Sequence, residues 1–248
     1  MTARTRNLAI LGATGSIGRS TLEVAAAAPD RFRVVGLSAN SQTDQLAQHA
    51  QRFRPAWVVV TDPAAGARLR REDFPAETEL RIGADWLPKS VSGPEVDMVV
   101  AAIVGSAGLR GTWAALEAGK PVALANKETL VVGGPLVTQL SARRNAPLLP
   151  VDSEHSAVFQ LLHAGRREDL RRVVLTASGG PFRRHTREQL EHVSIADALA
   201  HPTWNMGRKI TVDSATMMNK ALEIIEAKWL FSVDPDRIEV VIHPESII

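Results

Sequence analysis

The sequence predicts an α/β fold in which a parallel sheet with helices on both faces is followed by a second α/β domain. Through the first 150 residues, short apolar runs alternate with helical segments. The runs are continuously apolar, which is typical of strands buried on both faces in a parallel sheet. After about residue 150 the sequence changes to motifs that contain clustered carboxylates. We therefore expect domains over residues 1–150 and 151–248.

The elements of the first domain follow in a regular order. Predicted strands cover residues 7–11, 33–37, 56–60, 97–104 and 120–124, and predicted helices cover 19–28, 43–53 and 109–118. Ligands of such sheets bind beyond the carboxyl ends of the strands. That edge is expected to hold four segments, which are residues 12–18, 38–41, 105–108 and 125–128.

A glycine motif, Gly-Ala-Thr-Gly-Ser-Ile-Gly at residues 12–18, separates the first strand from the first helix. Its glycines allow a sharp turn and a close approach to a pyrophosphate at the N-terminus of the helix. The strand before it and the helix after it favour a dinucleotide site, and the alternative is an ordinary tight turn. Residues 38–41 contain no carboxylate that would repel a 2′-phosphate, which favours NADP, although no arginine or lysine stands there.

Composition limits the classes of function. The chain of 248 residues has no apolar run near the 18 or so that a membrane span requires, so no membrane is expected. It contains no cysteine, which excludes disulfides, thiolate metal sites and a cysteine nucleophile, and a cytoplasmic location is expected. The net charge is only +2 and aromatic residues make up 4%, so no nucleic acid is expected as a partner.

The second domain opens with two nearby carboxylates. If the segment is extended, Asp152 and Glu154 project to the same side, where they repel each other unless a cation stands between them. The alternative is a helix N-terminus, with Asp152 or Ser153 as the cap of a helix over 157–163. The two interpretations are compatible.

Residues 212–231 predict a helix that follows a strand at 209–212 and begins at a cap, Asp213 or Ser214. An apolar stripe is expected to face the core and consists of Met218, Leu222, Ile225 and Trp229. A polar stripe is either a solvated face or part of a site, and consists of Thr216, Asn219, Lys220 and Glu223. Glu223 could join Asp152 and Glu154 as a third oxygen ligand, and three carboxylates without a thiolate favour Mg²⁺ or Mn²⁺.

Two loops could complete such a pocket. Residues 178–181, Ser-Gly-Gly-Pro, follow a predicted strand at 173–177 and could offer a hydroxyl and N–H groups to a phosphate, or form an ordinary turn. Residues 201–207 contain Trp204 and could form a lid that excludes water, or a loop anchored to the core by this tryptophan.

Six motifs then occur in the order of a known family. They are residues 12–18, Ala-Asn-Lys-Glu at 125–128, Val-Asp-Ser-Glu-His at 151–155, Ser-Gly-Gly-Pro-Phe at 178–182, His-Pro-Thr-Trp-Asn-Met-Gly-Arg-Lys at 201–209 and Val-Asp-Ser-Ala-Thr-Met-Met-Asn-Lys-Ala-Leu-Glu at 212–223. Together they closely resemble the 1-deoxy-D-xylulose 5-phosphate reductoisomerase family over the whole chain.

The resemblance implies rearrangement of 1-deoxy-D-xylulose 5-phosphate and reduction by NADPH to 2-C-methyl-D-erythritol 4-phosphate, with Mg²⁺ or Mn²⁺, in non-mevalonate isoprenoid biosynthesis. It also implies a homodimer of the full-length protein, a Rossmann-like NADPH-binding domain over 1–150 and a catalytic domain over 151–248. Because the family continues beyond the last predicted strand, 238–242, we expect the catalytic domain to be incomplete at its C-terminus.

The family's functional residues are carried over motif by motif. Cofactor contacts are expected from Thr14, Gly15, Ser16, Ile17, Asn126, Glu128 and Gly207, together with Ala39, Asn40 and Ser41, which stand where family members often carry Gly-Lys-Asn. The metal would be held by Asp152, Glu154 and Glu223, which with Lys127 form the expected catalytic set. Lys127 and Ser153 would contact the reacting end of the substrate. The phosphate end would be held by Ser178, His201, Ser214, Asn219 and Lys220, with Trp204 closing over the substrate.

Two alternatives belong to other classes. A semialdehyde dehydrogenase on a similar fold needs a cysteine nucleophile, which the chain lacks. A non-catalytic or inactive nucleotide-binding fragment, with carboxylates that only cap helices, would show no loss of metal affinity on Glu223→Gln.

Overall fold

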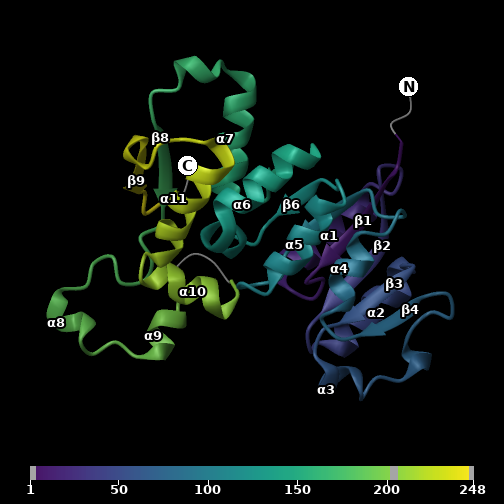
Figure 1. Ribbon diagram of the computed structural model, residues 1–248. Coiled ribbons are helices and arrows are strands. Elements are labelled where there is room, and N and C mark those ends of the chain that lie inside the picture. Colours follow the sequence, from purple (N-terminus) through teal and green to yellow (C-terminus); the bar gives the residue numbers. More distant parts are fainter. Residues whose placement is uncertain (1–3, 202–205, 246–248) are drawn as a thin grey trace. The chain divides into compact units, whose positions relative to one another are not determined.

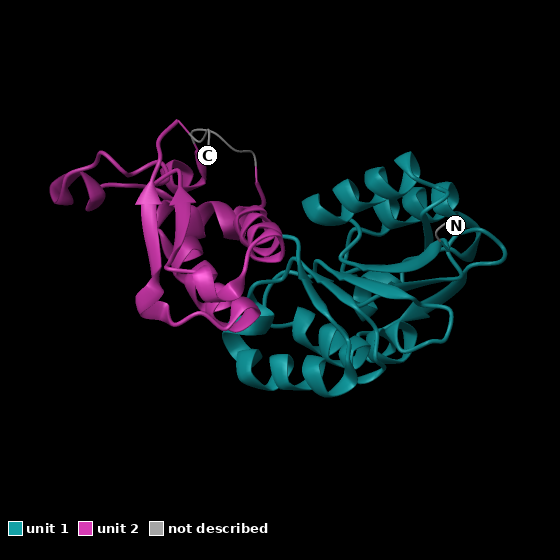
Figure 2. Ribbon diagram, turned by 90° about the horizontal axis from the view of Figure 1, so that it is seen from above, with its two compact units in different colours: residues 1–151 teal, residues 152–248 magenta. Residues whose placement is uncertain are grey.

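The computed structural model describes residues 4–201 and 206–245, and the chain divides into two compact units, Met1–Val151 and Asp152–Ile248 (Figures 1 and 2). The boundary lies within one residue of the predicted position. Each unit has its own core and its own sheet.

Unit 1 contains, among the described residues, a seven-stranded sheet in the order β4-β3-β2-β1-β5-β6-β7, and every neighbouring pair is parallel. Its strands are β1 (Arg6–Leu11), β2 (Phe32–Ala39), β3 (Trp57–Val60), β4 (Glu79–Ile82), β5 (Met98–Ala101), β6 (Val122–Leu124) and β7 (Leu148–Pro150). The parallel sheet confirms the prediction from continuous apolar runs. The strand expected over 97–104 ends at Ala101, and β4 and β7 were not predicted.

Helices lie on both faces of this sheet (Figure 2). They are α1 (Ser16–Ala27), α2 (Thr43–Phe53), α3 (Pro63–Gly66), α4 (Trp86–Val91), α5 (Gly108–Glu117) and α6 (Glu128–Arg144), with a 3₁₀ turn η1 (Arg71–Asp73). Residues along a single strand, such as Ala9, Ile10 and Leu11 of β1, are all completely buried. Burial of consecutive residues requires apolar side chains on both faces, which explains why these strands have no polar alternation.

In the described part of unit 2, two parallel strands pair with each other, β8 (Val173–Ala177) and β9 (Ile238–Ile242). Its helices are α7 (Ser153–Ala164), α8 (Arg187–Leu190), α9 (Ile195–Leu199), α10 (Arg208–Ala215) and α11 (Met218–Phe231), with 3₁₀ turns η2 (Arg167–Asp169) and η3 (Pro235–Arg237). Buried side chains from both strands and α11 form the core of this unit, including Leu175, Ala227, Phe231 and Ile238. No helix among the described residues is long and apolar enough to cross a membrane.

Three local predictions in unit 2 were wrong. Residues 209–212 belong to helix α10 rather than to a strand, so Asp213 and Ser214 lie inside that helix and cap nothing. Helix α11 begins after Met217, whose left-handed backbone (φ 61°) turns the chain between the two helices. The predicted burial of the apolar stripe is also wrong, because Met218 and Ile225 are 51% and 37% exposed.

The two charged residues of the predicted polar stripe are buried instead. Lys220 and Glu223 are 5% and 1% exposed, and Glu226, one turn further, is 1% exposed. A helix that buries charged groups must pair them, since an isolated buried charge is very costly. The partners of these residues define the candidate site.

Candidate active site

At the carboxyl edge of the unit 1 sheet, the glycine loop is tied to the end of β2. Gly12 N–H donates to the Ser38 hydroxyl at 3.1 Å, and Ala13 N–H donates to the Ser38 carbonyl at 2.8 Å. Helix α1 starts directly after Gly15 with no side-chain cap hydrogen bond, and Gly15, Ser16 and Ile17 are exposed. A helix N-terminus of this kind suits a phosphate group.

Two positions in this loop require glycine. Gly12 has a left-handed backbone (φ +82°), and a Cβ there would lie 2.6 Å from the Ala102 carbonyl oxygen. A Cβ on Gly18 would lie 2.3 Å from the Gly12 carbonyl oxygen, so the helix could not pack against its own turn. Both contacts are with backbone atoms, which cannot move aside cheaply.

The other two predicted segments of this edge meet at Asn126, which is 3% exposed. Its amide nitrogen donates to the Gly105 carbonyl at 3.0 Å and to Glu128 Oε2 at 2.7 Å, and its oxygen accepts from Thr129 N–H at 3.1 Å. Asn126 thus joins the loop after β5 to the start of α6, where Lys127 is the N-cap residue. The sequence correctly predicted that these segments share one edge.

The residues after β2 have different environments. Ala39 is 3% exposed, and Asn40 and Ser41 are exposed. The amide oxygen of Asn40 accepts from the Thr61 hydroxyl at 2.9 Å. A contact of these residues with a 2′-phosphate stays a prediction.

Unit 2 contains a cavity of about 540 Å³, which gathers most of the residues predicted for the metal and substrate. The predicted residues that line it are Asp152, Ser153, Glu154, Ser178, His201, Ser214, Asn219, Lys220 and Glu223. Gly207, the N-cap of α10, is not among its lining residues. Trp204 lies outside the described residues, so its predicted role as a lid stays a prediction.

The three carboxylates predicted as metal ligands come together in this cavity. Asp152, Glu154 and Glu223 each offer an oxygen, and these atoms lie within 4.8 Å of one another. Asp152 is the N-cap residue of α7 without a side-chain cap bond, and Glu154 lies in the first turn. Three carboxylate oxygens in this arrangement fit a hard divalent cation such as Mg²⁺ or Mn²⁺.

A lysine neutralises part of this cluster. The Lys220 ammonium donates to Glu154 Oε1 at 2.8 Å, to Glu223 Oε2 at 2.5 Å and to the Thr176 carbonyl at 2.6 Å. Burial alone would raise the pKa of Glu154, but the charge and hydrogen bond of Lys220, with a hydrogen bond from Ser153, lower it to about 2. Asn219 also donates to Glu223 Oε1 at 2.5 Å. The Glu154 carboxylate is thereby kept as an ionised oxygen donor.

A second part of the cavity offers hydroxyl, imidazole and N–H groups. Ser178 follows β8, and its hydroxyl lies 3.2 Å from His201 Nε2 and accepts from Gly180 N–H at 3.3 Å. Burial, and then the charge of Arg183, lower the pKa of His201. Gly180 has φ +68°, and a Cβ there would lie 2.5 Å from the Ser214 carbonyl oxygen, so this loop packs against α10.

Several lining residues were missed by sequence analysis, and His243 is the most informative. It follows β9 directly, and its N–H donates to the Ala177 carbonyl at 2.7 Å. Because β8 and β9 are parallel, residues after their carboxyl ends meet at one edge. The pairing of the two predicted strands was the signal that could have found it. Thr176, Met206, Ile210 and Met217 also line the cavity.

Comparisons with known proteins match both units. A sequence model described as 1-deoxy-D-xylulose 5-phosphate reductoisomerase matches residues 8–134, and one described as the C-terminal domain of that enzyme matches residues 148–231. A reductoisomerase of this name from Trichlorobacter lovleyi is 55% identical over 243 residues, which cover 98% of this chain and 62% of the relative. Another, from Geobacter sp. (strain M21), is 54% identical over 98% of this chain and 63% of its own.

Solved structures of proteins with this name are also similar to the chain. A DOX-P reductoisomerase in complex with NADPH, fosmidomycin and magnesium has a TM-score of 0.91 and 44% identity over 97% of this chain and 62% of its own. The enzyme from Zymomonas mobilis in complex with NADPH has a TM-score of 0.89 and 42% identity, over 98% of this chain and 63% of its own. The chain thus spans about 62% of the length of the relatives it matches.

Proposed function

The chain belongs to the 1-deoxy-D-xylulose 5-phosphate reductoisomerase family, and we propose that the full-length protein converts 1-deoxy-D-xylulose 5-phosphate to 2-C-methyl-D-erythritol 4-phosphate. The reaction would use NADPH and a divalent cation, Mg²⁺ or Mn²⁺. Relatives with solved structures bind NADPH and magnesium.

We assign the cofactor to the sheet edge of unit 1. The uncapped start of α1 and the close turn at Gly12 and Gly18 support binding of a pyrophosphate there. NADPH, when bound, supplies the hydride for the reduction. The proposed cofactor contacts are Thr14, Gly15, Ser16, Ile17, Asn126, Glu128 and Gly207, with Ala39, Asn40 and Ser41 near the 2′-phosphate.

The observation that carries the proposal is the convergence of Asp152, Glu154 and Glu223 within 4.8 Å. These residues would hold the cation, which when bound acts as a Lewis acid on carbonyl and hydroxyl oxygens of the substrate. Ser153, next to two of these ligands, and Lys127 would orient the reacting end. Such orientation lowers the barrier by fixing the reacting carbons before the skeleton rearranges.

The phosphate end of the substrate would bind at the other part of the same cavity. Ser178, His201 and Ser214 offer hydroxyl and imidazole donors there. Asn219 and Lys220, which bond to the carboxylate cluster, add amide and ammonium donors beside it, and such groups suit a phosphate. Binding energy from this non-reacting end can orient the carbons that react. Trp204 would exclude water from the intermediate by closing over it.

The test is NADPH oxidation by the full-length protein with 1-deoxy-D-xylulose 5-phosphate. We expect the NADPH absorbance to fall with Mg²⁺ or Mn²⁺ and to stay constant when a chelator removes divalent ions. Glu223→Gln should abolish the reaction, because it removes a charged ligand. Glu239→Gln is the matched control, since Glu239 is an exposed residue of unit 2 that pairs with Arg172 at 3.0 Å. Constant absorbance with either ion would refute the activity, and equal rates without any ion would refute the metal assignment.

We also propose a homodimer in the cytoplasm for the full-length protein, as the family resemblance implies. Light scattering during gel filtration tests the first expectation, and cell fractionation tests the second. A monomer at working concentration would contradict the dimer.

A further inference from the structure

Behind the three carboxylates lie two buried polar residues to which the proposed function gives no role. His155, on α7, is 0% exposed, and Glu226, on α11, is 1% exposed. Neither lines the cavity, so neither is placed to touch substrate. A buried carboxylate and a buried imidazole are costly to keep unless they serve each other or a neighbouring group.

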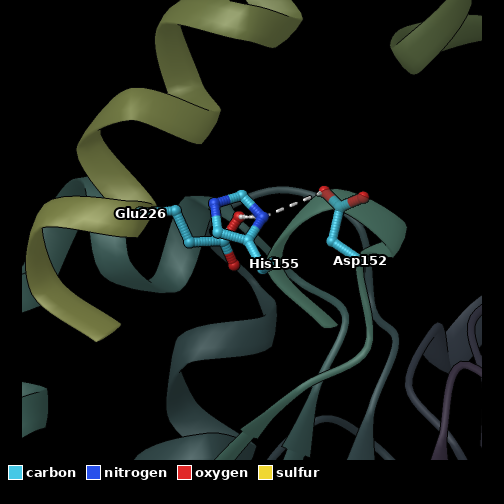
Figure 3. A group of neighbouring side chains, drawn as sticks. All are labelled: Asp152, His155 and Glu226. Atoms are coloured by element: carbon cyan, nitrogen blue, oxygen red, sulfur yellow. Dashed lines mark ion pairs between the residues drawn. The ribbon is translucent and has the colours of Figure 1, made fainter. Parts of the chain in front are cut away.

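The imidazole of His155 connects both helices that supply the carboxylates. Its Nε2 lies 2.9 Å from the backbone carbonyl oxygen of Glu223. A carbonyl oxygen only accepts, so Nε2 carries a hydrogen and donates it. Its Nδ1 faces two carboxylates, with Glu226 Oε2 at 3.6 Å and Asp152 Oδ2 at 3.9 Å (Figure 3).

A neighbouring aromatic ring also packs beside His155. Phe231, which is 4% exposed, stacks against it with an interplanar angle of 17°. Glu226 and Glu223 are separated by three positions on α11, so they lie on the same side of the helix. A single imidazole is thus fixed by α11 through Phe231, Glu226 and the Glu223 carbonyl, and it reaches Asp152 on α7.

We propose that Glu226 and His155 are positioning residues for the divalent-cation site: Glu226 fixes the His155 imidazole, and the imidazole holds Asp152 in register with Glu223. The inference rests on the proposed function, since it concerns the ligands of the same cation. Buried partners of ligating side chains commonly act in this way and are worth 10- to 100-fold in metal affinity. The same three side chains could instead ligate a second ion, because their nearest atoms also lie within 4.8 Å. The links to the Glu223 carbonyl and Phe231 favour the positioning role.

The experiment measures Mn²⁺ binding to the full-length protein by electron paramagnetic resonance of the free ion, without substrate. We expect one Mn²⁺ per chain in the wild type. Glu226→Gln keeps the shape of the side chain and removes its charge, and it should weaken Mn²⁺ binding about 10- to 100-fold with one ion still bound at saturation. His155→Gln should do the same, and the double variant should be no weaker than the weaker single variant, because both residues act through one contact.

Controls separate positioning from folding. His163→Gln is the matched control, since His163 lies on the same helix and is exposed, and its Nδ1 lies 2.8 Å from the Phe159 carbonyl oxygen one turn earlier. It should leave Mn²⁺ affinity unchanged. The NADPH affinity of every variant should match the wild type, since none of the substituted residues is a proposed cofactor contact. Thermal unfolding identifies any variant that fails to fold. In that case Glu226→Asp, which keeps the charge but withdraws it from Nδ1, should still weaken Mn²⁺ binding.

Three outcomes overturn the inference. Mn²⁺ affinities of Glu226→Gln and His155→Gln within twofold of the wild type would leave both residues a purely structural role. Additive losses in the double variant would mean that they act separately. Two ions in the wild type, with one lost in Glu226→Gln, would make Glu226 a ligand. Different results would contradict the proposed function. They are wild-type protein that binds no Mn²⁺, or a Glu223→Gln variant that binds Mn²⁺ as tightly as the wild type.

Discussion

Replacing Lys220 by methionine should destabilise unit 2 strongly when no divalent cation is present. Methionine keeps an apolar stem of similar length and removes the ammonium that lies 2.8 Å from Glu154 Oε1 and 2.5 Å from Glu223 Oε2. The side chain of Lys220 is 7% exposed, so little water replaces its charge. The two carboxylates would then repel each other in a buried site.

The magnitude follows from the pKa of Glu154. Burial would raise this pKa, yet Lys220 and Ser153 bring it to about 2 from an ordinary 4.5. One pKa unit corresponds to about 1.4 kcal/mol, so the ionised form is favoured by about 3 kcal/mol in the folded protein. Breaking a buried ion pair by removing one partner costs about 3–5 kcal/mol, which is the same range. We expect the free energy of unfolding of Lys220→Met to be lower by about 3 kcal/mol.

The assay is urea unfolding at neutral pH in the presence of a chelator. Lys228→Met is the matched control, because Lys228 lies on the same helix and its ammonium lies over the Trp229 ring, at 4.8 Å from its centre. That contact is worth about 0.5–1 kcal/mol. Saturating Mn²⁺ should restore much of the stability lost in Lys220→Met, since a ligand that binds only the folded state stabilises it. Equal free energies of unfolding for Lys220→Met and the wild type would contradict the proposed stabilisation by Lys220, as would a lack of any effect of Mn²⁺.

Three further predictions concern single groups. The carboxyl carbon of Glu154, followed by NMR in the wild type, should titrate with a midpoint near pH 2. The stability that its charge contributes is then fully present above pH 4.5 and is lost as the pH falls towards 2. A midpoint at or above pH 4.5 would contradict the ion pair with Lys220. Gly18→Ala should weaken NADPH binding at least about tenfold in a fluorescence titration, because the added Cβ would lie 2.3 Å from the Gly12 carbonyl oxygen and would displace the turn. An unchanged NADPH affinity would mean that this turn does not contribute to the cofactor site. Asn126→Ala should lower the free energy of unfolding in urea by about 2–3 kcal/mol, because it leaves the Gly105 carbonyl and the Thr129 N–H without this partner. A loss of less than about 1 kcal/mol would contradict a stabilising role of these two hydrogen bonds.

The parallel sheet could be predicted because its strands are buried on both faces and therefore lack polar residues. The two missed strands lack that signature. β4, with the sequence Glu-Leu-Arg-Ile, is an edge strand with no buried residue, and β7 has three residues that end in a proline. Both pair with a neighbour through backbone hydrogen bonds, which depend little on side chains. Sequence periodicity is insensitive to strands of this kind.

The orientation of α11 could not be predicted from its own residues. Its apolar side chains fit one stripe, but the break at Met217 and the partner of Lys220 decide which face is buried. That partner, Glu154, is 66 residues away in the sequence, and the contact of His155 with the Glu223 carbonyl spans 68. Each half of these pairs looks like an ordinary surface residue in its local sequence. The choice between a solvated stripe and a site is therefore made by tertiary contacts.

The departure of α11 from amphipathic packing is itself an argument for function. A helix that only contributed to the core would bury Met218 and Ile225 and leave Lys220, Glu223 and Glu226 in water, which costs no desolvation. This helix does the reverse, with two apolar residues exposed and three charged residues buried. Buried ion pairs rarely stabilise a fold better than apolar residues of the same volume would. Conflicts between local pattern and packing are expected at functional sites, and here the conflict centres on the carboxylates of the proposed cation site.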